Sequence, residues 1–224
     1  MAYAARASSA RPLAAGEVAP WEALALAAAL AFCAFLLVLA TSRAAVFWSF
    51  PAVLIAFVYP FFKRFFAIPQ AFLGIAFSFG IPMAFAAATG DVPWFAWALT
   101  AINLFWVIAY DTEYAMVDRD DDLAIGIRTS AITFGRYDVG AVAFCYAVHV
   151  AGMAWVGVER AMGPIYFAGV AVAGAIAVHH MRLIRGRDRA ACFRAFLHNH
   201  WLGFAVFAGV ALDYGIRLSA WPHR

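Results

Sequence analysis

Charged residues are scarce in this sequence of 224 residues. Asp, Glu, Lys and Arg together make up 13% of the chain, about half the share that is usual in soluble domains. Hydrophobic residues make up 66%, and the mean hydropathy is +0.81. This composition excludes a soluble enzyme and a disordered chain, and the formal net charge of only +3 does not favour a polyanionic partner such as DNA. We therefore expect an integral membrane protein that does not bind nucleic acid.

Cysteine and processing signals are scarce as well. The three cysteines, Cys33, Cys145 and Cys192, show no CxxC spacing, and we interpret them as small packing residues. The first twenty residues contain no short apolar run followed by a small-residue cleavage site, so no signal peptide is predicted. No internal repeat or soluble domain divides the chain. We expect one membrane domain over residues 1–224.

Long apolar runs dominate the remaining sequence. A membrane-spanning helix requires about 20 residues, and the runs between charged and turn residues predict seven spans. The predicted fold class is therefore an all-α, multi-pass transmembrane helical bundle. We expect Pro51 and Pro82 to kink their helices. The predicted spans are 21–40, 44–59, 68–88, 93–110, 139–158, 164–180 and 201–218.

The basic residues divide unequally between the two ends of this bundle. Of the 16 lysines and arginines, 12 fall on the side of the N-terminus, and only Arg43, Arg160, Arg217 and Arg224 fall on the other. Cytoplasmic loops of membrane proteins carry the excess of Lys and Arg. The N-terminus is therefore predicted to lie in the cytoplasm and the C-terminus outside.

The acidic residues are concentrated at the cytoplasmic end of the fourth predicted span. A charge run is ordinarily a solvated loop. Here, however, Asp118 and Asp122 lie about 20° to either side of Asp111 if the helix continues, whereas Asp120 points the opposite way. Carboxylates so close to the membrane are costly unless they serve a site. Six of the 13 acidic residues belong to this group: Asp111, Glu113, Asp118, Asp120, Asp121 and Asp122.

Three carboxylates on one face favour a divalent cation, because they repel each other unless a cation neutralises them. Mg²⁺ typically takes one or two carboxylates together with phosphate oxygens of a substrate. A second polar group, Tyr59, Lys63 and Arg64, leaves the second span on the same side of the membrane. This group is typical of an interfacial tyrosine with flanking cations, but it could also bind phosphate. A lipid diphosphate would satisfy both groups.

These residues give the sequence a recognisable pattern. The segment AYDTEYAMVDRDDD at 109–122, followed by IGIRTS at 125–130, resembles the second aspartate-rich motif of the UbiA-type intramembrane prenyltransferases. Within that family the sequence is most similar to the members that use 4-hydroxybenzoate in ubiquinone biosynthesis. Weaker matches are RPL at 11–13 with Gly16, YPFFKR at 59–64, GIPMAFA at 80–86 and ACF at 191–193.

The resemblance implies nine helices around a central cavity open to lipid, in the bacterial inner membrane with the active-site loops in the cytoplasm. It implies transfer of a polyprenyl group from polyprenyl diphosphate to an aromatic acid acceptor with Mg²⁺ as cofactor. The metal ligands would be Asp111, Asp118 and Asp122. The catalytic residues would be Asp111, Asp118 and Tyr59, and the substrate-binding residues Lys63, Arg64, Arg11 and Arg128. Arg43 is an alternative partner for the acceptor carboxylate.

The sequence departs from the family in one respect. The family's first motif, Asn-Asp-x-x-Asp-x-x-x-Asp, is expected before the RPL element and is not found in this chain. The seven predicted spans correspond to the family's nine without the first two. We therefore expect either an N-terminally incomplete prenyltransferase domain or a degenerate relative.

Three other functions remain open at the level of sequence. The acceptor could be another ring of the homogentisate, naphthoate or porphyrin type. The chain could also be an inactive relative that binds lipid diphosphate or a partner subunit. A cation transporter is disfavoured, because most spans lack acidic residues.

Two other polar groups receive structural interpretations. His179, His180, His198 and His200, together with Asn199, are interpreted as residues at the membrane interface, since no carboxylate accompanies them at ligand spacing. The arginines between positions 182 and 194 are interpreted as topology anchors that contact anionic lipid headgroups.

Overall fold

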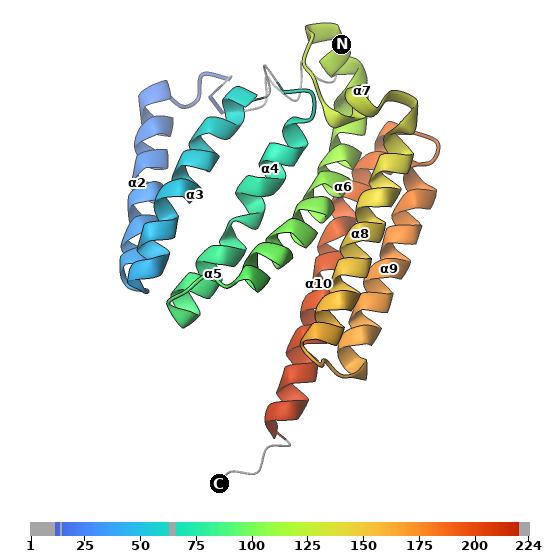
Figure 1. Ribbon diagram of the computed structural model, residues 1–224. Helices are drawn as coiled ribbons and strands as arrows, with labels where there is room; N and C mark the ends of the chain where they lie inside the picture. The colour runs from blue at the N-terminus through green and yellow to red at the C-terminus, as the bar shows by residue number, and fades with distance from the viewer. Residues whose placement is uncertain (1–11, 14, 63–65, 220–224) are drawn as a thin grey trace.

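The computed structural model describes residues 12–13, 15–62 and 66–219, and its regular elements within these ranges are all helical (Figure 1). This confirms the predicted fold class. The helices in chain order are α2 Pro20–Leu39, α3 Arg43–Phe62, α4 Pro69–Ser78, α5 Gly80–Thr89, α6 Trp94–Ile125, α7 Ser130–Phe134, the 3₁₀ turn η1 Gly135–Tyr137, α8 Asp138–Glu159, α9 Pro164–Ile184 and α10 Arg189–Ser219.

Six helical segments in the described part of the chain are long and apolar enough to cross a membrane. They coincide with six of the seven predicted spans. The remaining prediction, 44–59, lies in α3, whose apolar part Arg43–Tyr59 is shorter. Figure 1 nevertheless shows α3 running beside α2 along the molecule. The six segments are Pro20–Leu39, Pro69–Thr89, Trp94–Ala124, Ser130–Glu159, Pro164–Ile184 and Arg189–Ser219.

Proline interrupts one of these spans as expected. Helix α4 ends at Ser78 and α5 begins at Gly80, two residues before Pro82. Pro82 has no N–H to donate to the carbonyl of Ser78, and its ring crowds that carbonyl, so the helix breaks there. In contrast, α3 is a single helix that continues through Pro51.

Helix α6 is continuous through the acidic segment. It runs for 32 residues and ends where Gly126 adopts a left-handed conformation with φ of +71°. Glycine tolerates this conformation, and the Gly126 N–H bonds the last carbonyls of the helix. Because the helix is uninterrupted from Trp94 to Ile125, the helical phase predicted for the acidic residues applies.

The core lies between α6, α8, α9 and α10, which pack side by side on one side of the molecule in Figure 1. Much of it consists of small side chains, which let helices approach closely in lipid. Helix α2, on the opposite side, buries no side chain. Cys33 on α2 is exposed, so its interpretation as a packing residue is wrong, whereas Cys145 and Cys192 are buried. Core members include Ala109, Met116, Val142, Tyr146, Ala177, Ala195 and Leu202.

The described arginines are concentrated at one end of the bundle. Helix α6 ends at the upper end of Figure 1, where α8 and α10 begin. Most of the described arginines lie at or near this end, in helix ends and loops, including Arg128, Arg136 and Arg187, whereas Arg43 and Arg217 lie toward the other end. This arrangement agrees with the predicted division of basic residues.

A close contact between α9 and α10 suggests a stability test with Gly169→Ala. A Cβ atom at Gly169 would lie 2.6 Å from the Ala205 carbonyl oxygen and 2.9 Å from Gly209 Cα, so α9 and α10 would have to separate. Overpacking of this kind costs about 1 to 3 kcal/mol. We expect the midpoint of thermal unfolding in detergent to fall by about 2 to 12 °C.

The matched control is Gly174→Ala on the same helix. A Cβ atom there meets only Val150 Cγ1, at 3.6 Å, which is an ordinary contact. We expect an unchanged or slightly higher midpoint, because alanine favours a helix over glycine by about 1 kcal/mol. Equal midpoints for the two variants would contradict the assignment of the close contact.

Candidate active site

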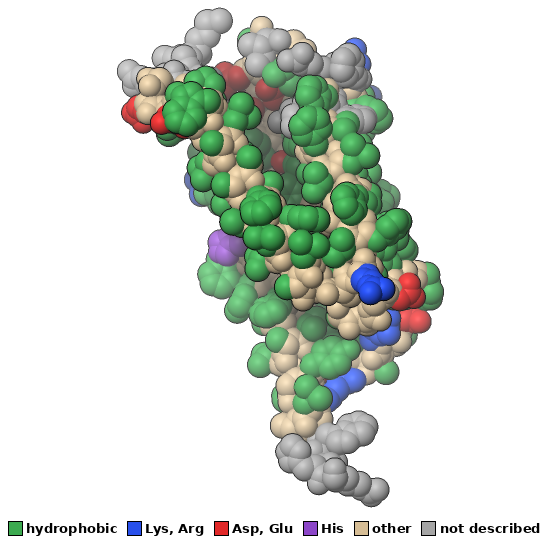
Figure 2. Space-filling view, turned by 90° about the vertical axis from the view of Figure 1, so that its left-hand side faces the viewer, with side chains coloured by type: hydrophobic (Ala, Val, Ile, Leu, Met, Phe, Trp, Pro, Cys, Tyr) green, Lys and Arg blue, Asp and Glu red, His purple; other side chains and the backbone are tan. Residues whose placement is uncertain are grey.

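Asp111 and Tyr59 lie within electrostatic range of each other although they come from different helices. Asp111 lies on α6 and is partly buried, and Tyr59 lies near the end of α3. The Asp111 carboxylate interacts electrostatically with the phenols of Tyr59 and of Tyr110, its neighbour on α6. The structure therefore brings together two residues that the sequence selected from separate motifs. Viewed from the α2 side, acidic side chains are visible at the upper end of the molecule and in the hollow between two columns of hydrophobic side chains (Figure 2).

The next carboxylates along α6 contact the beginning of α10. Arg189, the first residue of α10, lies 3.5 Å from Asp118 and 2.8 Å from Asp121, measured from Nη2 to the nearest carboxylate oxygen. The side chains of Asp118 and Asp121 are 35% and 28% exposed. These ion pairs tie the acidic end of α6 to α10 while leaving Asp118 accessible to a ligand.

A second ion-pair cluster surrounds Asp138, the first residue of α8. Its carboxylate is fully buried and accepts hydrogen bonds from Arg187 at 2.6 Å and from Arg119 at 3.3 Å. Arg187 also donates to the Arg136 carbonyl oxygen, and its backbone is held at a positive φ of +55°. Its hydrogen bonds to Asp138 raise the pKa of the Arg187 guanidinium above its usual value.

These contacts correct the interpretation of the arginine run at 182–194. Arg187 and Arg189 form ion pairs with carboxylates of α6 and α8. Their guanidinium groups therefore hold helix ends together and are not simply lipid contacts. Sequence alone did not distinguish them from neighbouring arginines, since the partner carboxylates lie about 50 to 70 positions away in the chain.

The carboxylates of α6 fit a metal that arrives with a substrate. Seven residues of helix separate Asp111 from Asp118, a rise of about 10 Å, so both cannot ligate one ion. The described residues contain no group of three or more His, Cys, Asp or Glu side chains that could hold a metal alone. Mg²⁺ needs only one or two carboxylates when phosphate oxygens complete its coordination. The spacing therefore suits a metal diphosphate better than a closed metal site.

Of the other predicted site residues, the structure describes Arg128 and Arg43. Arg128 is exposed in the loop after α6, near the acidic end of that helix. Arg43 begins α3 at the opposite end of the molecule from the acidic end of α6, so the structure does not bring it near the acidic residues. Lys63, Arg64 and Arg11 lie outside the described residues.

Sequence reasoning missed the role of Glu113. Its side chain is fully buried in the core, where it contacts Tyr146 of α8 and Asn199 of α10. Asn199 and His180 are also buried, so their interpretation as interfacial residues is wrong. Helical phase could have indicated this difference, because Glu113 lies about 200° around α6 from Asp111 and therefore on another face of the helix.

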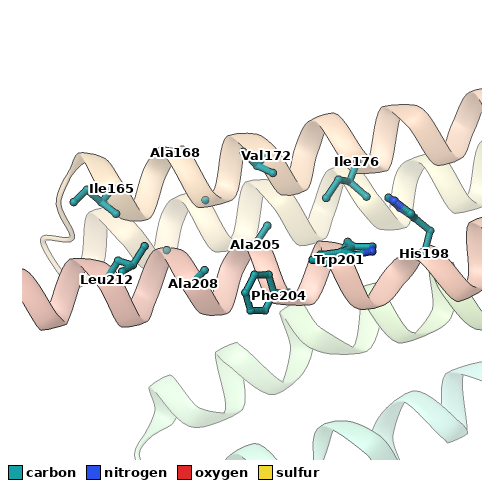
Figure 3. Close-up of a pocket in the computed structure, with 12 residues that line it drawn as sticks. Ile165, Ala168, Val172, Ile176, His198, Trp201, Phe204, Ala205, Ala208 and Leu212 are labelled. Carbon is teal, nitrogen blue, oxygen red and sulfur yellow. The ribbon is translucent and has the colours of Figure 1, made fainter.

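An apolar groove of about 530 Å³ lies between α9 and α10 (Figure 3). Its walls include Val172, Ile176 and Phe204, and His198 stands at one end. The lining contains no carboxylate, lysine or arginine. The groove therefore provides no charged group for a metal or a diphosphate.

Comparison with known proteins gives consistent results. Residues 4–206 match the sequence model of the UbiA prenyltransferase family. The chain is 61% identical to the 4-hydroxybenzoate octaprenyltransferase of Azoarcus sp. (strain BH72) over 204 residues, covering 91% of this chain and 71% of the relative. It is 61% identical to the protein of the same name from Thiobacillus denitrificans (strain ATCC 25259 / T1) over 207 residues, covering 92% and 71%.

A solved structure has the same fold. The apo structure of a UbiA homolog from Aeropyrum pernix K1 superimposes with a TM-score of 0.77 at 25% sequence identity. The match covers 92% of this chain and 77% of that one. The fold similarity therefore extends over almost the whole chain.

The Asp138 cluster predicts that Asp138→Asn destabilises the protein. The substitution removes the charge that two guanidinium groups share at a fully buried position. Because those groups are 31% and 39% exposed, we expect a loss of about 2 kcal/mol, below the range for a wholly buried pair. The unfolding midpoint should fall by about 4 to 8 °C. Asp120→Asn, the same change at an exposed residue, should leave it within about 1 °C; equal effects would refute the assignment.

Proposed function

The chain belongs to the UbiA prenyltransferase family, and we propose that it transfers a polyprenyl group from polyprenyl diphosphate to the ring of 4-hydroxybenzoate in ubiquinone biosynthesis. The observation that carries the proposal is its 61% identity to relatives named 4-hydroxybenzoate octaprenyltransferase. The acidic face of α6 beside Tyr59 supports it, because a lipid diphosphate requires both an apolar bundle and groups that bind its head.

The reaction exchanges one bond for another. The bond between the allylic carbon and the diphosphate oxygen breaks, and diphosphate leaves with the electron pair. The ring carbon next to the phenol oxygen then bonds to the allylic carbon, and the ring loses a proton. The protein must therefore stabilise the leaving group, exclude water from the allylic cation and accept a proton.

The residues of α6 and α3 suit these tasks. Asp111, Asp118 and Asp122 would hold Mg²⁺ together with diphosphate oxygens, with Asp111 and Asp118 on separate ions, and the bound metal would make diphosphate a better leaving group by neutralising its charge. Tyr59 lies within electrostatic range of Asp111, and the reacting carbon would lie near its ring. One carboxylate of the acidic segment accepts the ring proton, and the surrounding apolar helices keep water from the cation.

The location follows from the same features. The chain is an integral membrane protein. We place it in the bacterial inner membrane with the acidic end of α6 toward the cytoplasm, because most of the described arginines lie at or near that end of the bundle. Lys63 and Arg64, which follow α3, would bind diphosphate oxygens on that side.

Transfer activity provides the direct test. Membranes containing the protein, supplied with 4-hydroxybenzoate, polyprenyl diphosphate and Mg²⁺, should form the prenylated acid. Asp111→Asn and Asp118→Asn should each reduce kcat/KM by at least about 100-fold, since each removes a charge from the diphosphate site. Asp120→Asn, on the opposite face of α6, should retain activity within about threefold. Product formed only with a different ring would overturn the acceptor assignment.

Metal dependence gives a separate prediction. Treatment with EDTA should abolish product formation, and added Mg²⁺ should restore it, because the carboxylates alone cannot bind diphosphate. The measurement is initial rate against free Mg²⁺ concentration, with Ca²⁺ as a control ion of the same charge and larger radius. Full activity in EDTA would refute the proposed role of the acidic face.

A further inference from the structure

Glu113 connects the helix of the acidic motif to three other helices through buried hydrogen bonds. The Tyr146 hydroxyl of α8 lies 2.9 Å from Glu113 Oε1, and Asn199 Nδ2 of α10 donates to Glu113 Oε2 at 2.8 Å. His180 of α9 lies 3.0 Å from the same hydroxyl, measured to Nδ1. All four side chains are at least 95% buried.

The outer members of this cluster are also paired. Asn199 Oδ1 accepts from Trp106 Nε1 at 3.0 Å, and it lies 2.9 Å from the Tyr146 hydroxyl. His180 Nε2 lies 3.0 Å from Nδ1 of His198, which stands at the end of the α9 and α10 groove in Figure 3. The amide of Asn199 therefore has both its oxygen and its nitrogen in use, which fixes its orientation.

This cluster determines how α6 can rotate about its axis. Successive residues of an α-helix are about 100° apart around its axis. A rotation of α6 about its axis by that angle would carry Glu113 away from both Tyr146 and Asn199. Buried polar groups left without partners are costly, and a lipid environment offers no water to replace them. Hence one rotational setting of α6 is strongly preferred.

The same setting orients the acidic face. Asp111 lies about 200° from Glu113 and Asp122 about 180°, so both point away from the side of α6 that contacts Tyr146 and Asn199. The electrostatic contact of Asp111 with Tyr59 of α3 agrees with this direction. Glu113 thus lies on the opposite side of the helix from the diphosphate site.

We propose that Glu113 is a positioning residue, whose hydrogen bonds to Tyr146 and Asn199 fix the rotation of α6 and thereby aim Asp111 and Asp122 at the substrate diphosphate. The inference rests on the proposed function, since it concerns the same site. In this proposal Glu113 does not contact the substrate. Its effect on the reaction is transmitted by the rigid helix between the two faces.

Two variants of Glu113 test the proposal. In Glu113→Gln, the amide oxygen can accept from Asn199 and the amide nitrogen can donate to Tyr146, which can then donate to Asn199. In Glu113→Leu, a side chain of similar size offers no hydrogen bond. For folded protein, the KM for polyprenyl diphosphate should stay within about threefold of the original in Glu113→Gln and rise at least about tenfold in Glu113→Leu.

A pair of tyrosines supplies a milder test should Glu113→Leu fail to fold. Tyr146→Phe removes a hydroxyl that contacts Glu113, whereas Tyr166→Phe removes one that donates to the Met153 carbonyl, and both residues are almost fully buried. Only Tyr146→Phe should weaken binding of geranyl diphosphate with Mg²⁺, by about tenfold in a titration of the purified protein. Thermal unfolding of both variants provides the control for general destabilisation.

The outcomes separate this inference from the proposed function. If the unaltered protein fails to prenylate 4-hydroxybenzoate, the proposed function is wrong, and titration with geranyl diphosphate still tests the role of Glu113. If Glu113→Leu, or failing that Tyr146→Phe, binds geranyl diphosphate like the unaltered protein, the inference is wrong. Equal weakening by Tyr146→Phe and Tyr166→Phe would also overturn it, because loss of any buried hydroxyl would then suffice.

Discussion

A carboxylate enclosed by membrane helices must find its hydrogen-bond partners within the protein, because lipid supplies none. Asp138 and Glu113, both fully buried, meet this constraint in different ways. Asp138 uses the charges of Arg119 and Arg187 near the end of the bundle, and Glu113 uses the neutral polar groups of Tyr146 and Asn199 inside it. Since these partners belong to different helices, the hydrogen bonds and ion pairs of the two carboxylates also fix how those helices lie relative to one another.

Helix α6 combines this structural role with a functional one. One face carries Asp111, Asp118 and Asp122, and the opposite face carries Glu113. Such a division lets a rigid core element present charged ligands toward a site without moving them when substrate enters. The small residues of the core and the close approach of α9 to α10 at Gly169 make the neighbouring bundle a compact support.

Much of the fold and part of the site were predictable from local features of the chain. Apolar length identified the helices, Pro82 identified the break between α4 and α5, and helical phase placed Asp111 and Asp122 on one face. The partners of buried charges were not predictable. Arg187 and Arg189 resemble the other arginines of their segment, and nothing local distinguishes the buried His180 from an interfacial histidine.

The sequence by itself determined the membrane class, the order of the helices and the acidic motif, because each depends on composition and spacing within a few turns of chain. Only the tertiary structure decided that Tyr59 lies within electrostatic range of Asp111 and that Glu113 faces a polar cluster from three other helices. Those contacts join residues tens of positions apart. They depend on how whole helices rotate and pack, which the pairing of buried polar groups decides.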